Sequence, residues 1–349
     1  MTTATLPLWR RRLFGTPATG LVTVLLGLLL AWIAIPIIRW ALIDATWVGT
    51  TRADCQAGGA CWVFIRARFG QFMYGLYPVE ERWRADLAGI AFLIGIGMVV
   101  FAPSRLRLKT AIAMLVILPP LGIWLLSGGF GLRYIETREW GGLMLTLFIS
   151  VYASLIAIPL GILLALGRQS ELRVVRLISV LFIEFWRGVP IIAVIFLASL
   201  LLPLILPGGI GIDRLARAVI GLGLVIAAYM AEAVRGGLQA LPPGQREAAT
   251  ALGLTYWKAT GLVILPQALR ISLPAMTNEF IALVKNTTLV LVVSILDLLG
   301  IAQASLADPN WVGMNMEAYA FSGSIYWLIC FALSRWGRHL ETIGRRQHR

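Results

Sequence analysis

Long apolar stretches alternate with short polar segments along the chain. A bilayer core about 30 Å thick takes roughly 20 apolar residues in a helix, and eight stretches approach that length. They are Leu21–Trp40, Leu87–Ala102, Ala111–Leu126, Trp140–Leu166, Leu177–Leu206, Leu215–Val234, Pro266–Val284 and Ala318–Trp336. The fifth is the longest and is interrupted by Glu184, Arg187 and Pro190. The pattern predicts an all-α integral membrane protein with about eight transmembrane helices.

Basic residues gather at alternate ends of these stretches. The clusters lie at 10–12, 105–109, 168–176, 235–270 and 335–349. Cytoplasmic loops carry an excess of Lys and Arg, so all five clusters lie in the cytoplasm if both termini do. The loop over residues 44–86 balances acidic against basic side chains and is expected outside. We therefore expect a multi-pass protein of the bacterial inner membrane with cytoplasmic N- and C-termini.

Composition supports the same class. Of 349 residues, 59% are hydrophobic and 13% are charged, whereas soluble domains carry about 25% charged residues. A soluble globule and a disordered chain are both disfavoured. The net charge of +13 follows the predicted topology, and no basic module interleaved with aromatic residues suggests nucleic acid. We expect membrane lipid to surround the protein.

Candidate catalytic chemistry is sparse. The two histidines, His339 and His348, both lie near the C-terminal end. The chain contains no HExxH metal motif, no GxSxG elbow and no GxxxxGK[ST] phosphate loop. We expect a protein that is not an enzyme, holds no metal and binds no cofactor of its own.

Two cysteines, Cys55 and Cys61, lie six positions apart in the outer loop. In an oxidising compartment they can form a small disulfide. Two free cysteines near the start of a helix fit the spacing equally well.

The loop over residues 236–260 has more helix signals than a connection requires. Pro242 and Pro243 suit a helix start, and Gly253 suits a stop after good helix formers. The predicted short helix presents Glu247 and the small residues Ala248 and Ala249. Such a surface suits docking of a partner, and a surface helix without a partner fits the spacing as well.

A family pattern distinguishes these two interpretations. Glu247-Ala248-Ala249, then Gly253, then residues 263–266 (VILP), resemble the EAA loop of ABC-importer permeases, with Val263 where that pattern has Ile. Further segments are similar to the polar and general L-amino-acid branch of these permeases. They are Phe185–Pro190, Ala228–Gly253, Pro266–Leu289 and Ser294–Gly300. The resemblance runs from Trp140 to the C-terminus. The three preceding stretches resemble the N-terminal extension of permeases of general L-amino-acid uptake.

The resemblance implies a type I ABC importer permease core of five helices over 140–349, with its coupling loop at 236–260 and an extension with three helices over 1–139. It implies that two cytoplasmic ATP-binding subunits bind ATP and Mg²⁺. It further implies a second permease subunit, expected to be a different chain, and a periplasmic amino-acid-binding protein. The residues expected at the ATPase contact are Arg246, Glu247, Ala248, Ala249 and Gly253.

Several charged residues fall in or near the apolar stretches, where they are costly and usually face a partner or a cavity. Glu184 and Arg187 are three positions apart and can pair on one helical face. The same holds for Glu232 and Arg235. We interpret these pairs as structural, with a gating role left open, and Asp297 as a helix-end or outer-gate residue.

The seventh stretch carries the candidate substrate path. Transporters place polar groups near the membrane midplane, on interrupted helices. Glu279 could receive the ammonium group of an amino acid and Asn278 either end, while Lys285 or Thr287 could meet the carboxylate. Hydrogen bonds between helices are the competing interpretation.

Two other functions remain to be separated from an ATP-driven importer. An ion-gradient-driven secondary transporter would account for the charged residues in the apolar stretches but not for the loop at 236–260. A membrane scaffold without transport activity has only the three N-terminal stretches in its favour.

Overall fold

The computed structural model describes residues 13–205 and 211–346, and the secondary-structure elements in these ranges are all helices. The basic cluster at 10–12, Leu206 at the end of the fifth predicted span, and His348 and Arg349 lie outside the described residues. The helices are α2 (Pro17–Ile38), α3 (Trp62–Tyr74), α4 (Arg82–Phe101), α5 (Ser104–Ser127), α6 (Gly142–Arg168), α7 (Arg173–Gly188), α8 (Ile191–Leu200), α9 (Leu202–Ile205), α10 (Arg214–Gln239), α11 (Gly244–Ala251), α12 (Tyr256–Ala259), α13 (Leu265–Asn286), α14 (Leu298–Ser305) and α15 (Asn315–Arg346).

Seven helical segments in the described ranges are long and apolar enough to cross a membrane, or eight if one bent pair counts as a span. This matches the expected class and the expected number of about eight. The segment that contains α13 is longer than predicted, because α12, a π-helical turn at Thr260–Ile264 and a 3-10 segment at Thr287–Val293 extend it to Tyr256–Val293.

The fifth predicted span is not one straight helix. It is divided into α7 and the α8–α9 pair, which are bent by 101° at the break. Pro190 explains the break, because proline lacks a backbone N–H and forces the preceding residue out of the helical region. Val189 accordingly has φ −90° and ψ 132°. The predicted interruption at Pro190 is therefore a break between two helices, and the stretch counts as one span only if the bent pair crosses the membrane together.

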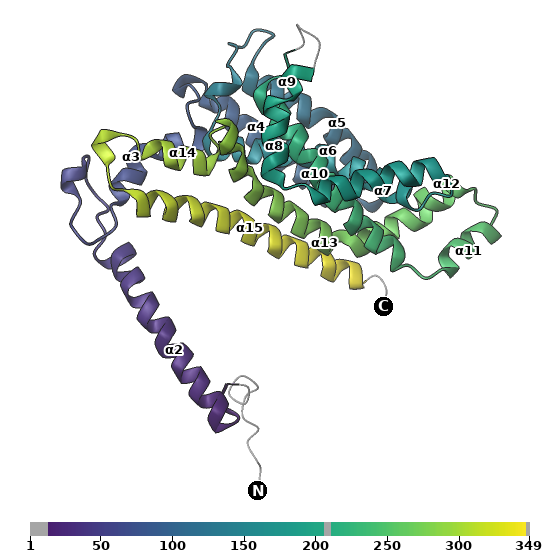
Figure 1. Ribbon diagram of the computed structural model, residues 1–349, viewed down its shortest axis with the longest axis horizontal. Coiled ribbons are helices and arrows are strands. Elements are labelled where there is room, and N and C mark those ends of the chain that lie inside the picture. The colour runs from purple at the N-terminus through teal and green to yellow at the C-terminus, as the bar shows by residue number, and fades with distance from the viewer. Residues whose placement is uncertain (1–12, 206–210, 347–349) are drawn as a thin grey trace. The chain divides into compact units, whose positions relative to one another are not determined.

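The chain divides into two compact units. The larger consists of Phe69–Ser305 and the chain from Tyr319 onward, and its central helix is α10, which packs against α6, α7, α8 and α13 (Figure 1). In the most apolar window of α10, 67% of the residues are buried, compared with 33% in α6. This helix bundle positions the loop that contains α11.

Glycines allow the helices around α10 to approach closely. A Cβ atom at Gly161 of α6 would lie 2.7 Å from the Met230 Cβ of α10, and one at Gly237 would lie 2.4 Å from the Ala268 carbonyl oxygen of α13. Small residues at helix interfaces are typical of membrane bundles, where close van der Waals packing drives association. These glycines thus let α10 lie close against α6 and α13.

The smaller unit combines the described part of Met1–Arg68 with Leu306–Ala318. In it, Cys55 and Cys61 form a disulfide with a Cα–Cα distance of 5.5 Å. Of the two arrangements that the spacing left open, the structure contains the disulfide.

Candidate functional site

Helix α11 is short and has well-defined ends. It starts after Pro243 and ends at Ala251, and Gly253 follows the C-cap residue with a φ of +76°, which is accessible to glycine at little cost. The N–H of Leu254 donates to the carbonyl of Ala249 at 3.1 Å, and the N–H of Gly253 donates to that of Thr250 at 2.9 Å. These two bonds form a Schellman motif. The predicted stop at Gly253 therefore has a backbone reason.

The side chains of α11 face in two directions. Glu247 and Ala248 are exposed, whereas Ala249 is only 3% exposed, because its side of the helix packs toward α12 and the turn at Thr260–Ile264. The expectation that all three residues are presented to a partner is corrected for Ala249. Beyond the helix, Leu252 and Trp257 are 80% and 76% exposed. The loop thus presents a carboxylate beside uncovered apolar side chains.

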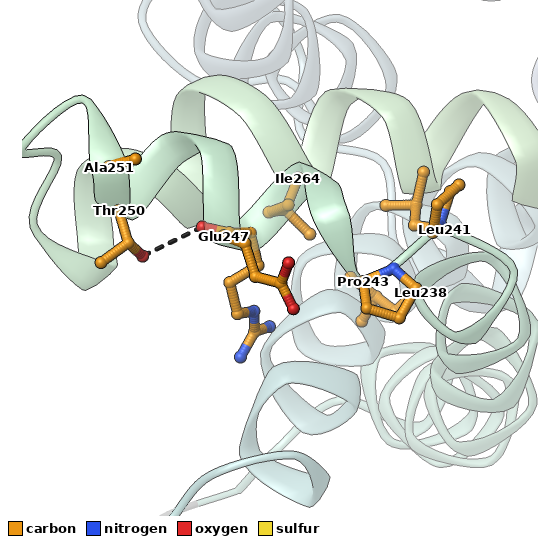
Figure 2. A pocket seen from close by; sticks show the side chains of 9 residues that line it. Leu238, Leu241, Pro243, Glu247, Thr250, Ala251 and Ile264 are labelled. Atoms are coloured by element: carbon orange, nitrogen blue, oxygen red, sulfur yellow. Dashed lines mark hydrogen bonds between the residues drawn. The ribbon is translucent and has the colours of Figure 1, made fainter.

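A groove of about 720 Å³ lies beside α11. Figure 2 shows the Glu247 carboxylate pointing from α11 toward Pro243, and Leu238, Leu241 and Ile264 also line the groove. The neighbouring Arg246 also lines the groove, and its guanidinium carbon lies 5.9 Å from the ring centroid of Tyr256. Within the part of the chain that the structure describes, no group of three His, Cys, Asp or Glu side chains could hold a metal ion.

Five charged residues form a network at the end of α10 nearest α11. Glu232 receives hydrogen bonds from Arg168 of α6 at 2.9 Å and from Arg235 Nη2 at 2.8 Å, and Arg187 of α7 lies 3.8 Å away. Arg168 also donates to Glu184 of α7 at 2.9 Å. The Glu232 side chain is 17% exposed. The network thus joins α6, α7 and α10 through one carboxylate.

Of the two ion pairs predicted from spacing, the network contains Glu232–Arg235 but not Glu184–Arg187. Glu184 pairs with Arg168 and Arg187 pairs with Glu232, so the expected Glu184–Arg187 pair is replaced by contacts between helices. Glu232 and Arg235 pair as their spacing predicted. The sequence indicates Arg168 only as part of a basic cluster that marks membrane topology. It does not reveal that Arg168 donates hydrogen bonds to both Glu184 and Glu232. Arg168 is the last residue of α6, and only the fold shows that Glu184 of α7 and Glu232 of α10 lie within its reach.

The candidate substrate residues do not all come together. Glu279 is half-buried on α13 and interacts electrostatically with Arg187, whereas Asn278 and Lys285 are exposed. Thr287 is fully buried and donates to the carbonyl of Val284 at 2.9 Å. The structure therefore groups Glu279 with Arg187 and separates Thr287 from them.

Asp297 lies at a helix end, as expected. Its carboxylate accepts a hydrogen bond from the Gly300 N–H at 2.9 Å and so caps α14, which begins at the next residue. Tyr326 of α15 donates to the same carboxylate at 2.6 Å, and the Thr287 hydroxyl lies 3.3 Å from it. Burial raises the pKa of Asp297 above its usual value, and the hydrogen bonds that it accepts oppose that shift. Asp297 therefore joins the 3-10 segment that follows α13 to α14 and α15.

Comparison with known proteins places this arrangement among transport components. A family model described as "Binding-protein-dependent transport system inner membrane component" matches residues 157–342. The chain is 49% identical over 343 residues to the inner membrane amino-acid ABC transporter permease protein YhdY of Escherichia coli (strain K12), covering 97% of this chain and 94% of that protein.

Two further similarities extend this result. The chain is 36% identical over 412 residues to the glutamate/glutamine/aspartate/asparagine transport system permease protein BztC of Rhodobacter capsulatus, covering 97% of this chain and 94% of that protein. A chain in a crystal structure of an amino acid ABC transporter with histidines superposes with a TM-score of 0.51 at 32% identity, covering 58% of this chain and 91% of that chain.

Proposed function

The chain belongs to the family of inner membrane components of binding-protein-dependent transport systems, and we propose on this premise that it imports amino acids. Family membership makes it a non-catalytic permease subunit of the inner membrane that works with a separate ATPase and a substrate-binding protein. The amino-acid substrate is supported by YhdY and BztC, which match nearly the whole chain.

The observation that carries the coupling role is the geometry of α11. Its exposed Glu247 and Ala248 lie beside an open groove, and the Schellman motif at Gly253 fixes the helix end. We propose that this surface, with Arg246, docks on the ATPase. Ala249, whose side chain is buried, would instead hold α11 against α12.

ATP dependence tests the function. The chain, co-expressed with its ATPase and partner permease, is reconstituted in liposomes and supplied with labelled amino acid and the binding protein. Uptake should require ATP on the ATPase side and should survive collapse of the ion gradients by ionophores. Uptake that does not require ATP and that stops when the ionophore is added would instead establish a gradient-driven transporter. A complex that assembles with the ATPase and transports nothing would establish a scaffold.

The finer assembly follows the same proposal. We propose a heterodimer with a different permease chain, two ATP-binding subunits on the cytoplasmic side, and eight spans with both termini in the cytoplasm. The division into an extension over 1–139 and a core over 140–349 is supported by the family match, which lies within the latter range.

For the substrate path we propose Glu279 together with Arg187. A zwitterionic amino acid needs an anion for its ammonium group and a cation for its carboxylate. Glu279 supplies the first, and Arg187, which interacts with it electrostatically, supplies the second. Arg187 replaces Lys285 and Thr287 in that role, because Lys285 lies six residues beyond Glu279 on another face of the helix and the Thr287 hydroxyl donates to the Val284 carbonyl. Asn278 remains a candidate for a contact from a neighbouring chain, since it is exposed.

Glu279→Gln should lower uptake by about tenfold while the complex still assembles, because a hydrogen bond to a charged group contributes about 1.5–3 kcal/mol. Initial uptake rates at equal membrane levels provide the measurement. The matched control is Glu171→Gln, which removes an exposed carboxylate between α6 and α7 and should leave uptake unchanged. Equal rates for the two variants would remove Glu279 from the path.

A further inference from the structure

The smaller unit joins two segments that are far apart in the sequence. It combines the N-terminal region up to Arg68 with Leu306–Ala318, which contains the connection from α14 to α15 and the start of α15. The first segment lies outside the residues matched by the family model, and the second lies inside them. The N-terminal region therefore contacts a part of the permease core whose position affects the start of α15.

The N-terminal segment is held in one conformation by its own backbone. The N–H of Thr46 donates to the carbonyl of Ala60 at 2.8 Å, and the N–H of Trp62 donates to the carbonyl of Thr46 at 3.0 Å. The Cys55–Cys61 disulfide closes the loop between these residues. Since Cys61 immediately precedes α3, the disulfide also fixes the first turn of that helix.

Three contacts then join this segment to 306–318. The Cys61 N–H donates to the Glu317 Oε1 at 2.9 Å, and Glu317 is only 5% exposed. Arg68 forms an ion pair with Asp308. The ring centroids of Phe64 and Trp311 lie 5.6 Å apart, and both residues are buried. The contacts are of three kinds and come from three separate points of the 306–318 segment.

Glu317 makes this junction sensitive to the disulfide. A buried carboxylate that loses a donor keeps its desolvation cost, so loss of the Cys61 N–H is more costly than loss of a surface contact. Glu317 also lies in the first turn of α15, where a negative charge is favourable. The position of Cys61 therefore affects the first turn of α15.

We propose that the N-terminal extension is a clamp that positions the 306–318 segment of the core, that the Cys55–Cys61 disulfide keeps the clamp closed, and that transport requires it closed. Glu317, Asp308 and Trp311 are positioning residues in this role. Only the uptake measurement below rests on the transport function proposed above; amide exchange reports the clamp itself.

The test uses the assembled importer in nanodiscs, with hydrogen exchange measured by mass spectrometry over peptides that cover 306–318. Arg68→Glu and Asp308→Arg should each speed exchange there by about tenfold, because exchange follows local opening. The double swap, Arg68→Glu with Asp308→Arg, should restore protection and uptake together. Replacing Cys55 and Cys61 with serine should speed exchange in the same peptides, whereas Cys330→Ser, which removes the free cysteine of α15, should not.

Two results would overturn the proposal. Exchange over 306–318 that is unchanged in both single charge variants and in the double serine variant would exclude the clamp. Faster exchange with unaltered uptake would exclude its requirement for transport. Failure of every variant and of the unsubstituted complex to transport amino acids, with the exchange pattern as expected, would count against the proposed substrate and leave the clamp supported.

Discussion

Replacing Glu247 with arginine is expected to lower ATP-dependent uptake by about tenfold or more while the protein still inserts and assembles, since interfacial charge pairs couple by about 1.5–7 kcal/mol. Glu247 is exposed on α11 and its carboxylate points into the groove beside that helix (Figure 2). The substitution places two guanidinium groups side by side, because Arg246 lines the same groove. Initial uptake rates and ATP hydrolysis by the reconstituted complex are the measurements. Hydrolysis should lose its dependence on the loaded binding protein.

The matched control for this variant is Glu171→Arg. Glu171 is also an exposed carboxylate, and it lies in the connection between α6 and α7, which the proposed topology places on the same membrane side. This control should transport at the rate of the unsubstituted protein. Normal uptake and normal coupling in Glu247→Arg would contradict the docking role of α11, because the inverted charge would then meet no partner.

Replacing Glu232 with glutamine is expected to destabilise the packing of α6, α7 and α10 where their ends meet around this residue. The side chain keeps its shape and loses its charge, which leaves Arg168, Arg187 and Arg235 facing one another. Breaking a buried ion pair costs about 3–5 kcal/mol and an exposed one about 0–1 kcal/mol, so a carboxylate that is 17% exposed should cost about 1–3 kcal/mol. Thermal unfolding of the detergent-purified subunit measures this loss, and uptake should fall with it.

Glu184→Gln provides the comparison within the same network. Glu184 is 53% exposed and pairs with Arg168, so its loss should lower stability by less than about 1 kcal/mol. If the two variants unfold at the same temperature, Glu232 does not hold the network together and the three helices are joined by packing alone.

Local sequence patterns predicted the features that depend on neighbouring residues. Gly253 marked the end of α11 because a left-handed residue is needed there, and Asp297 was expected at a helix end or outer gate and is found capping the start of α14. The pairing of Glu232 with Arg235 followed from their spacing on one turn. Each of these features is decided within four residues.

Features that depend on distant residues were not predictable in the same way. Glu184 and Arg187 have the same spacing as Glu232 and Arg235, yet Arg168 reaches Glu184 from another helix and displaces the local pair. The contact of Cys61 with Glu317 spans most of the chain. The break in the fifth apolar stretch was visible as Pro190, but the size of the bend depends on packing of α8 against α10.

The close backbone contact of Gly237 with Ala268 has a mechanical consequence. Helix α11 begins shortly after α10 ends, and Gln267 of α13 donates to Gln245 of α11 at 3.2 Å. A displacement of α11 would therefore move α10 and α13 together, because these two helices are in close contact. If the ATPase docks on α11 as proposed, its motion would tilt these two helices together.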